Sequence, residues 1–494
     1  MRLPDLVRRA YPERAGEADA LPDVPVSTVV QDARRVVPGA VFVARRGARV
    51  DAHRFAADAV AAGAILIVGA RPDGRSLPLG GVPYLSVPND RAAVARLAAA
   101  YHGAPSTRTR VLGVTGTDGK TTTAALMWWL LDDEAAPAAL SSSAMTRFGR
   151  THAPGEGRFT TPEASEVQAF LARAVDHGMA RVVLESSSHG LALGRLDEVQ
   201  YARAVWTNLA PEHLDFHGTL EAYRDAKISL IRRAGAAVLN RDDPHYPDFA
   251  AAADTHVSFG EDPRADWRLL SVAQPPGRLE LRIAAPNGRT LEATVPLVGR
   301  FNAWNALAAL AVAHAEGVPL PDATARLATF PGVPGRMQVV QAEPFTVVVD
   351  FAHTAPALAR ALEAVAPQQG RRIVVIGAAG ERDPAKRGPL GAAAVAGADV
   401  VVLTEEDARS EAVADILDAM VEGARGAGGR PGDDVRVVPD RREAIRTAVA
   451  LARPGDVVLL AGKGHEATLE RADEVLPWDE ASEARRALHD AGWG

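Results

Sequence analysis

The sequence of 494 residues contains no cysteine. Without cysteine there is no disulfide scaffold, no thiolate metal site and no cysteine nucleophile. The absence is typical of a protein from a reducing compartment, and we expect a cytoplasmic protein. The first twenty residues carry charges at short intervals, which leaves no apolar segment long enough for a secretory signal peptide.

Long apolar runs are also absent. No stretch of about 18 uncharged apolar residues occurs, so we expect no transmembrane helix and no insertion into a membrane. The net charge is −7, which argues against a surface that coats nucleic acid. An acidic protein can still hold a locally positive pocket, so we expect small-molecule substrates. No feature of the sequence indicates an oligomeric state.

The length and the alternation of the chain indicate its fold class. A single hydrophobic core stops growing at about 250–300 residues, so this length predicts two to four domains. Short runs rich in β-branched residues alternate with alanine-rich stretches of helical length, which predicts α/β domains with parallel sheets. The runs are residues 41–43, 64–68, 84–87, 111–114, 182–184, 204–206, 347–349, 373–376, 400–403 and 457–460. This pattern alone fits α/β domains of any function.

Proline and glycine mark two domain boundaries. Residues 102–107 and 330–335 are rich in both, and helices and strands avoid such stretches. The three domains that we expect cover residues 1–107, 108–333 and 334–494. Within the second domain, alternating runs at 279–283 and 291–295 flank the dipeptide Asn287-Gly288, which predicts a β-hairpin.

A glycine-rich turn carries the sharpest local signal. Gly116-Thr117-Asp118-Gly119-Lys120-Thr121 follows the run at 111–114, and a helix of good length continues through Leu131. Glycines let backbone N–H groups close around phosphate oxygens, and the helix N-terminus favours an anion. The Lys120 ammonium can reach the outer phosphates, and the Thr121 hydroxyl can bind Mg²⁺. Val114 stands where the strict phosphate-loop pattern has its first glycine, yet we expect phosphate binding rather than a plain strand-to-helix turn.

Further segments carry groups that bind metal or phosphate. Glu185 follows the run at 182–184, so its carboxylate is expected at the carboxyl edge of the sheet, either as a Mg²⁺ ligand or simply solvated. Residues 207–218 hold two histidines, an aspartate and a glutamate in one loop, a density that favours a site over a lone loop histidine. Lys227 follows, and its position alone is typical of a lysine on a helix surface.

Taken in order, these segments resemble the Mur ligase family. The resemblance rests on Gly-Thr-Asp-Gly-Lys-Thr, on Glu-Ser-Ser-Ser-His-Gly-Leu from Glu185, on Thr-Asn-Leu-Ala-Pro-Glu-His-Leu-Asp-Phe-His-Gly from Thr207, and on Ala-Lys at Lys227. Residues 299–306, 335–337 and 350–354 extend it, so that it spans about residues 31–466. A phosphate loop alone serves kinases, GTPases, motors and ligases, so the ordered set decides the reaction class.

The resemblance implies an ATP-dependent, amide-bond-forming ligase of peptidoglycan precursor synthesis, with a role in cell-wall biogenesis, cell shape and cell division. Its fold is α/β in three domains. A central phosphate-loop ATPase domain with a parallel sheet is flanked by an N-terminal UDP-binding α/β domain and a C-terminal Rossmann-like α/β domain. Within the family the resemblance points to the branch that adds a diamino acid to UDP-N-acetylmuramoyl-L-alanyl-D-glutamate. It implies ATP and Mg²⁺ as cofactors.

The resemblance also implies roles for individual residues. The catalytic residues are Lys120, Glu185, His213, Lys227 and Asp350. The ATP-binding residues are Gly116, Thr117, Asp118, Gly119, Lys120, Thr121, Thr122, Asn302, Asn305, Arg336 and His353. The UDP-linked dipeptide is expected at Ala33, Thr160, Thr161, Ser187 and Arg195, and the amino-acid substrate at Arg382, Asp407, Arg409, Gly462 and Glu466. The metal ligands are Thr121, Glu185, His213 and Lys227, the last as an N-carboxylated lysine.

Three positions depart from the family pattern. Asp118 replaces the usual asparagine of the phosphate loop, and Ala33 replaces a serine near the uracil. Glu406-Asp407-Ala408-Arg409 stands where diaminopimelate-adding members read Asp-Asn-Pro-Arg. An arginine fork suits the distal carboxylate of meso-diaminopimelate, whereas the acidic pair suits the distal ammonium of L-lysine or L-ornithine. The sequence slightly favours meso-diaminopimelate.

The family chemistry fits the residues. ATP phosphorylates the free carboxylate of the dipeptide, and the incoming amine attacks the acyl phosphate, so cations are needed and a protein nucleophile is not. The alternatives are a folylpolyglutamate synthetase, the Mur ligase that adds D-Ala-D-Ala, and a phosphate-loop switch that forms no bond. The Gly-Lys-Gly-His-Glu segment at residues 462–466 argues against the first two. Phosphate release that depends on a UDP-linked peptide would exclude the switch.

Overall fold

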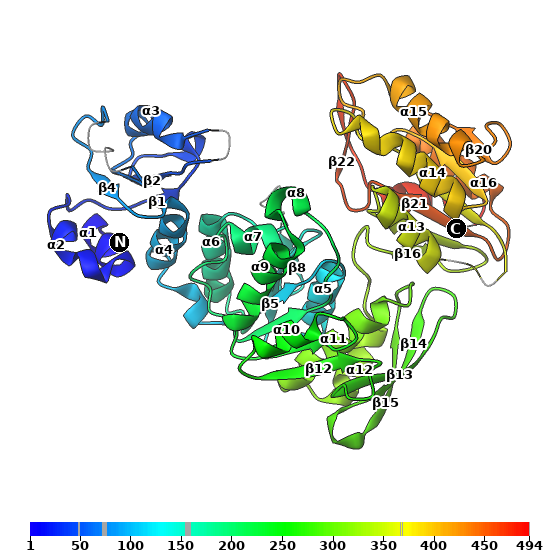
Figure 1. Cartoon of the computed structure of the whole chain (residues 1–494), viewed down its shortest axis with the longest axis horizontal. Helices are drawn as coiled ribbons and strands as arrows, with labels where there is room; N and C mark the ends of the chain where they lie inside the picture. The colour runs from blue at the N-terminus through cyan, green and yellow to red at the C-terminus, as the bar shows by residue number, and fades with distance from the viewer. Residues whose placement is uncertain (48–49, 72–76, 154–159, 366, 368, 494) are drawn as a thin grey trace. The chain divides into compact units, whose positions relative to one another are not determined.

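The structure is a computed structural model, and it describes all residues except 48–49, 72–76, 154–159, 366, 368 and 494. Contacts within the chain divide it into two compact units (Figure 1). The first unit comprises Met1–Lys120 and Leu131–Ser258, and the second comprises Thr121–Leu130 and Phe259–Gly494. Each unit is described by itself.

The first unit begins with a four-stranded parallel sheet in the order β1-β2-β3-β4. Its strands are β1 (Thr28–Val30), β2 (Ala40–Ala44), β3 (Leu66–Gly69) and β4 (Tyr84–Ser86). Its helices are α1 (Leu3–Ala10), α2 (Ala15–Asp19), α3 (Ala56–Ala61) and α4 (Asp90–Tyr101). Successive residues of a strand face opposite sides, so Val41 and Val43 pack with α1 and α4, while Phe42 packs with α3.

The rest of the first unit is built on strands in the order β11-β10-β5-β9-β6-β7-β8. They are β5 (Arg110–Thr115), β6 (Ala138–Ser141), β7 (Thr146–Phe148), β8 (Thr151–Ala153), β9 (Arg181–Glu185), β10 (Arg203–Trp206) and β11 (Ala237–Asn240). Helices α6 (Ala164–Asp176), α7 (Ser188–Ala192), α8 (Leu214–His217), α9 (Leu220–Arg232) and α10 (Tyr246–Ala251) accompany them. In the register, Thr115 of β5 pairs with Trp206 of β10, and Val114 pairs with Glu185 of β9. Because β5, β9 and β10 are parallel, the loops that follow them meet at one sheet edge.

The second unit includes strands in the order β15-β14-β13-β12. They are β12 (His256–Gly260), β13 (Trp267–Ala273), β14 (Leu279–Ala284) and β15 (Thr290–Val295), and they lie with α11 (Asn302–Ala315) and α12 (Leu320–Ala328). Most of α5 (Lys120–Leu131) also belongs to this unit. Strands β14 and β15 pair antiparallel around a turn at Pro286–Gly288, which confirms the hairpin that the sequence predicts.

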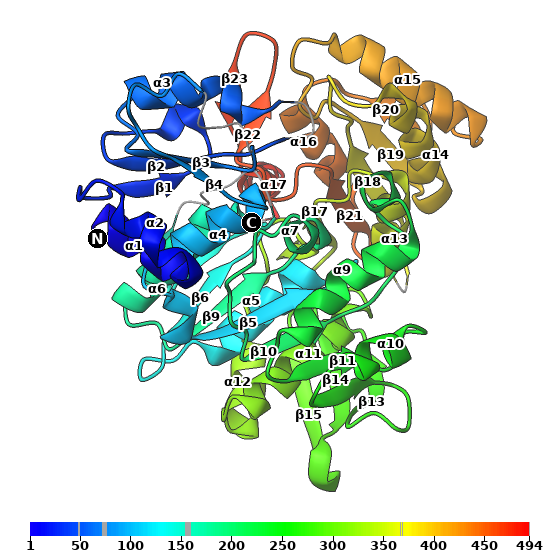
Figure 2. The same ribbon diagram turned by 60° about the vertical axis from the view of Figure 1, so that its left-hand side comes forward.

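The last part of the second unit is a six-stranded sheet in the order β16-β17-β21-β18-β19-β20 (Figures 1 and 2). Its strands are β16 (Gln338–Gln341), β17 (Thr346–Asp350), β18 (Arg372–Ile376), β19 (Val400–Leu403), β20 (Val435–Val437) and β21 (Val457–Ala461). Helices α13 (Ala355–Ala364), α14 (Arg387–Gly397) and α15 (Val413–Gly426) cover one face, and α16 (Arg441–Leu451) and α17 (Glu480–Asp490) cover the other. A small hairpin, β22 (Thr468–Glu470) with β23 (Val475–Pro477), precedes α17. All strands of this sheet are parallel except β16, which pairs antiparallel at the edge.

Every strand run that the sequence predicts overlaps a strand of these sheets, although the runs at 64–68 and 84–87 extend one or two residues beyond β3 and β4. Each is fully or largely buried, because a parallel sheet with helices on both faces leaves no polar side. Among the described residues, no helix is both long enough and apolar enough to span a bilayer.

Candidate functional site

The loop between β5 and α5 has the backbone of a phosphate-binding turn. Gly116 has φ +152°, and a Cβ atom at that position would lie 1.8 Å from the hydroxyl oxygen of Thr207, so only glycine fits. Gly119 has φ +80°, in the region that L residues with side chains rarely adopt. The loop therefore brings its backbone close to its neighbours, and α5 begins directly after it at Lys120.

The loop that follows β10 fixes this turn. The backbone N–H of Thr117 donates to the Asn208 carbonyl at 3.0 Å, and that of Asp118 donates to the Asn208 side-chain oxygen at 2.9 Å. The Thr207 hydroxyl donates to the Asp118 carbonyl at 2.6 Å. The Thr117 hydroxyl also lies 3.1 Å from the Tyr223 hydroxyl. These bonds order the turn in advance, which lowers the entropic cost of closing it around phosphates.

Lys120 points back over its own loop. Its Nζ donates to the carbonyl oxygens of Gly116, at 3.1 Å, and of Thr117. Thr121 and Thr122 follow in the first turn of α5, and both are buried. The predicted ATP-binding residues of this loop thus lie together at the N-terminus of α5 with the Lys120 cation beside them, an arrangement that favours phosphate.

Lys227 is buried, which corrects the interpretation of this residue as a lysine on a helix surface. Its side chain lies on α9, and its Nζ donates to the same Gly116 carbonyl oxygen that Lys120 uses. The Nζ also lies 4.2 Å from the centre of the Tyr223 ring. Burial, and then the Lys120 cation, lower the pKa of Lys227 well below its ordinary value. A lysine that loses its proton so readily is a nucleophile.

Glu185 and the histidines lie at the same sheet edge. The Glu185 carboxylate is buried at the end of β9 and accepts the backbone N–H of Ser143 at 2.8 Å. His213, the residue directly before α8, has φ +55°, and the centre of its ring lies 4.6 Å from the centre of the His189 ring. Burial and the neighbouring His213 and His217 lower the pKa of His189 to about 4, so its ring is neutral at neutral pH. Within the described ranges, no cluster of three or more acidic, histidine or cysteine side chains forms a metal site.

Three of the residues predicted for the dipeptide lie together. The Thr161 and Ser187 hydroxyl oxygens are 2.9 Å apart, and Arg195 donates to the Thr161 carbonyl at 3.0 Å. Arg195 also forms an ion pair with Glu163 at 2.8 Å, and Arg45 reaches the other oxygen of that carboxylate at 2.8 Å. The result is a polar cluster with two guanidinium groups around one carboxylate, which leaves a positive balance suited to an anionic substrate.

The other two residues predicted to bind the dipeptide are Thr160 and Ala33. Thr160 directly precedes Thr161 and is half-buried. Ala33 begins a short 3₁₀ turn (Ala33–Arg35) and packs against the apolar cluster around Phe42. Neither position shows a contact that assigns it a ligand.

The residues predicted on the adenine side form a chain of buried amides. The Thr123 hydroxyl of α5 donates to the Asn305 oxygen at 3.1 Å, and the Asn305 amide donates to Asn302 at 2.8 Å. The Asn302 amide in turn donates to the Val298 carbonyl at 2.7 Å. This chain fixes the start of α11 against α5.

Asp350 lies at the end of β17. Its two oxygens accept the backbone N–H groups of Met337, at 2.8 Å, and Ala352, at 2.9 Å, while burial raises its pKa. The Arg336 guanidinium lies 4.7 Å from the centre of the Phe351 ring. The ring nitrogen Nδ1 of His353 is 2.8 Å from the Phe351 carbonyl. Asp350 therefore organises the two segments that carry the other predicted C-terminal ATP contacts.

The predicted amino-acid pocket is centred on a lysine that the sequence prediction missed. Lys463 is fully buried, and its Nζ binds Asp407 at 2.7 Å and Glu466 at 2.6 Å. Asp407 is thus already paired with the Lys463 cation. Arg409 is paired with an anion, since it binds Glu470 at 2.9 Å, and it also donates to the Gly380 carbonyl at 2.6 Å.

Glu406 is the exception in this pocket. It is buried, and its Oε2 atom has no hydrogen-bond partner among the described residues. Burial raises the pKa of its carboxyl to about 7, against the opposing charge of Arg441. Gly462, with φ +103°, leaves room beside it, since a Cβ there would lie 3.0 Å from the Glu406 oxygen. Arg382, by contrast, is exposed on the loop after β18.

A recess of about 600 Å³ opens beside Arg409. Five carboxylates line it, those of Glu405, Glu411, Asp440, Asp473 and Glu474. Arg409 and Arg471 are the two cations of its lining. The approach to this side of the pocket is therefore acidic and suits a cationic solute.

One sequence signal could have marked Lys463, and it marks Lys227 as well. The chain holds 55 basic residues, yet only four are lysine: Lys120, Lys227, Lys386 and Lys463. Of these, only Lys386 is exposed. In a chain whose basic residues are nearly all arginine, a lysine marks a position that needs a compact ammonium or an amine that can lose its proton.

Comparisons with known proteins agree with this geometry. Residues 25–102, 114–313 and 335–464 match the families described as Mur ligase family, catalytic domain; Mur ligase middle domain; and Mur ligase, glutamate ligase domain. The chain is 47% identical to a UDP-N-acetylmuramyl-tripeptide synthetase of Deinococcus radiodurans, with 99% of each chain covered. It is 38% identical to a UDP-N-acetylmuramoyl-L-alanyl-D-glutamate–2,6-diaminopimelate ligase of Geobacillus thermodenitrificans, over 99% of this chain and all of the relative.

A solved structure of a UDP-N-acetylmuramoyl-L-alanyl-D-glutamate–2,6-diaminopimelate ligase has a similar fold. The TM-score is 0.68 at 29% identity, with 95% of this chain and 96% of the other covered. The chain belongs to the Mur ligase family, with the three-domain α/β fold of that family, and it is an ATP-dependent ligase that forms amide bonds.

Replacing Lys120 tests the nucleotide site. We expect Lys120→Ala to lower ATP-dependent phosphate release by about a hundredfold or more, because one charge-stabilising donor is lost from the transferring phosphoryl group. Steady-state phosphate release measures this. Lys386→Ala removes the exposed lysine and should keep full activity. Near-normal activity of Lys120→Ala would show that the phosphates bind elsewhere.

Proposed function

We propose that this ligase adds a diamino acid to UDP-N-acetylmuramoyl-L-alanyl-D-glutamate. The observation that carries the proposal is the pocket around the buried Lys463. There Asp407 and Glu466 each form an ion pair with Lys463, and one Glu406 oxygen has no hydrogen-bond partner in the part of the chain that the structure describes. Such a pocket fits a substrate that brings its own positive charge. The names of the relatives support the acceptor, since they include tripeptide synthetases and diaminopimelate ligases.

The proposed reaction has two steps. The free carboxylate of the dipeptide attacks the γ-phosphorus of ATP, which gives an acyl phosphate and ADP. The amine of the diamino acid then attacks the acyl carbon, and phosphate and a proton leave as the amide bond forms. Lys120 and the N–H groups of the phosphate loop stabilise the phosphoryl oxygens, while Arg195, Thr161 and Ser187 hold and orient the acceptor.

Mg²⁺ fits the residues at the sheet edge. It prefers oxygen ligands, and one or two carboxylates plus substrate phosphates satisfy it, so a dense cluster of acidic side chains is not needed. The buried Glu185 carboxylate, the Thr121 hydroxyl, His213 and a carbamate on Lys227 would hold it. When bound, Mg²⁺ neutralises charge on the phosphates.

We propose that Lys227 is carboxylated in the active enzyme. Its Nζ and that of Lys120 share the Gly116 carbonyl oxygen, and its pKa is lowered, so a neutral amine is available to attack CO₂. The amine forms an N–C bond and releases a proton, which converts a repelled cation into an anion beside Lys120.

The charges of the folded pocket favour a distal ammonium over a distal carboxylate. Four carboxylates lie in it, Glu406, Asp407, Glu466 and Glu470, against the two cations Lys463 and Arg409. Arg409 is already engaged, so a second substrate carboxylate would have to displace Glu470. We therefore propose L-lysine or L-ornithine as the added residue, in place of the slight preference for meso-diaminopimelate that the sequence indicates.

We propose that the domains follow the predicted boundaries near residues 107 and 333. The ranges matched by the three family descriptions, which stop at residue 102 and resume at 114, then stop at 313 and resume at 335, support this division.

Replacing Lys227 tests the carbamate. Lys227→Ala should be inactive, and short carboxylic acids at millimolar concentration should restore part of the activity by supplying the missing anion. Labelling with ¹³C-bicarbonate should give one carbamate signal in the wild type and in Lys386→Ala, and none in Lys227→Ala. A wild-type enzyme that is fully active without such a signal would contradict the assignment.

Two variants test which end of the diamino acid is recognised. Glu406→Gln should raise the KM for L-lysine or L-ornithine about tenfold or more, since a charge-assisted contact is worth about 1.5–3 kcal/mol. The KM values for ATP and for the UDP-linked dipeptide should stay the same. Arg409→Ala should change the amino-acid KM little. If instead Arg409→Ala raises the KM for meso-diaminopimelate, and that substrate is the preferred one, the proposal is wrong.

The pH dependence follows from the Glu406 carboxyl. Its pKa is about 7, so it is mostly protonated below pH 7 and must lose that proton to bind an ammonium. The amino-acid KM should therefore rise by up to about tenfold per pH unit below 7 and level off above it. Glu406→Gln should give a flat profile between pH 6 and 8. A wild-type profile that is equally flat would exclude this role for Glu406.

A further inference from the structure

Arg441 and Glu480 form an ion pair that water does not reach. Both side chains are fully buried, at the first residues of α16 and α17. The guanidinium approaches both carboxylate oxygens, at 2.7 Å and 3.0 Å, and the Trp478 indole N–H donates to the second oxygen at 2.6 Å.

The rest of the Arg441 donors reach the two backbone segments of the amino-acid pocket. One terminal nitrogen donates to the Glu405 carbonyl at 3.1 Å, and the other donates to the Ala461 carbonyl at 2.7 Å. Glu405 stands two residues before Asp407, and Ala461 stands two residues before Lys463. One rigid fork thus holds the two strands of chain whose side chains meet in the Lys463–Asp407 ion pair.

Stability alone does not explain a pair of this kind. Removing two charges from water costs several kcal/mol per ion, and apolar side chains of similar volume often stabilise a core as well or better. The guanidinium has a fixed planar geometry, and lysine cannot reproduce its several parallel bonds. What the pair adds is a defined distance between the Glu405 and Ala461 carbonyls.

We infer that Arg441 and Glu480 are positioning residues for the diamino acid, acting through the Glu405 and Ala461 carbonyls on Asp407, Lys463 and Glu466. Helix α17, near the end of the chain, thereby takes part in substrate selection without touching substrate. The inference rests on the proposed function, because it concerns the pocket assigned there to the incoming amino acid.

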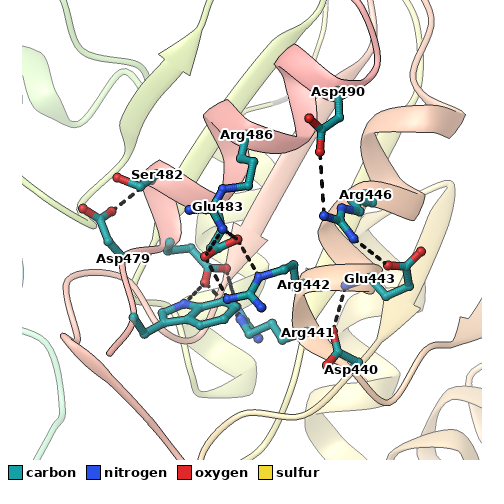
Figure 3. Close-up of polar contacts among 12 residues, drawn as sticks. Asp440, Arg441, Arg442, Glu443, Arg446, Asp479, Ser482, Glu483, Arg486 and Asp490 are labelled. Carbon is teal, nitrogen blue, oxygen red and sulfur yellow. Dashed lines mark hydrogen bonds and ion pairs between the residues drawn. The ribbon is translucent and has the colours of Figure 1, made fainter. Parts of the chain in front are cut away.

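A second ion pair joins the same helices and supplies a matched control. Arg442, the next residue of α16, binds Glu483 of α17 at 2.8 Å, and Arg486 binds the same carboxylate at 3.1 Å (Figure 3). Arg442 is 41% exposed and has no hydrogen bond or ion pair to either pocket segment among the described residues. Arg442→Met therefore loses an α16–α17 ion pair without releasing the pocket.

The test uses the full-length enzyme and the double variant Arg441→Met with Glu480→Gln, which leaves no unpaired charge in the core and keeps an acceptor for Trp478. We expect the KM for the diamino acid that the wild type uses to rise about ten- to a hundredfold, as displaced site groups typically cause. The KM values for ATP and the UDP-linked dipeptide should stay within about twofold, and Arg442→Met should match the wild type.

Two further measurements separate position from stability. Urea unfolding should show the double variant folded at the assay temperature, and Arg441→Lys, which keeps the charge but not the fork, should share the raised amino-acid KM. Burial, Glu466 and Asp407 raise the pKa of Glu406, whereas the Arg441 and Lys463 cations lower it. Loss of the Arg441 cation should therefore move the midpoint of the amino-acid pH profile to higher pH in the double variant.

An unchanged amino-acid KM in the folded double variant would overturn the inference, as would an equal rise in all three KM values. Failure of the proposed function looks different: the wild type itself would then use none of the diamino acids.

Discussion

Two lysine amines donate to one carbonyl oxygen, that of Gly116, and the nucleotide site depends on this shared contact. The oxygen is reachable only because residue 116 is a glycine packed against Thr207, and because the loop after β10 holds the turn closed. Burial, and then repulsion by the Lys120 cation at the same acceptor, lower the pKa of the deeper amine, Lys227. Carboxylation of that amine turns the repulsion into an attraction and supplies a metal ligand in the same step. The proposed carbamate therefore depends on the lysine pair, and the lysine pair depends on the turn that presents the Gly116 carbonyl.

In the amino-acid pocket, too, single cations each contact more than one acceptor. Lys463 pairs with the buried Asp407 and with Glu466, and Arg441 donates to the carbonyls of the two backbone segments. Across the described residues, the Glu406 Oε2 atom has no hydrogen-bond partner, and it lies in a pocket with more carboxylates than cations. L-Lysine or L-ornithine, whose only distal charge is an ammonium, completes that balance, whereas meso-diaminopimelate also brings a distal carboxylate that would have to break the Arg409–Glu470 pair.

The strands, the hairpin and the phosphate loop could be predicted because each depends on residues close together in sequence. Alternating or β-branched runs report burial directly, and a glycine-rich turn between strand and helix has few other uses. The burial of Lys227 could not be predicted, because it depends on which segments, distant in sequence, pack against the face of α9 that carries this residue. The Lys463–Asp407 and Arg441–Glu480 pairs join residues 56 and 39 positions apart, and no local pattern marks either. The resemblance named Lys227, and the scarcity of lysine marks both Lys227 and Lys463 without identifying their partners.

The identity of the amino acid joined to the acceptor tests the account most directly. The purified enzyme would receive ATP, Mg²⁺, UDP-N-acetylmuramoyl-L-alanyl-D-glutamate and an equimolar mixture of L-lysine, L-ornithine and meso-diaminopimelate, and the product would be weighed by mass spectrometry. The account predicts a UDP-linked tripeptide that carries lysine or ornithine, formed together with one ADP and one phosphate. A product that carries only meso-diaminopimelate, or no tripeptide at all, would contradict it.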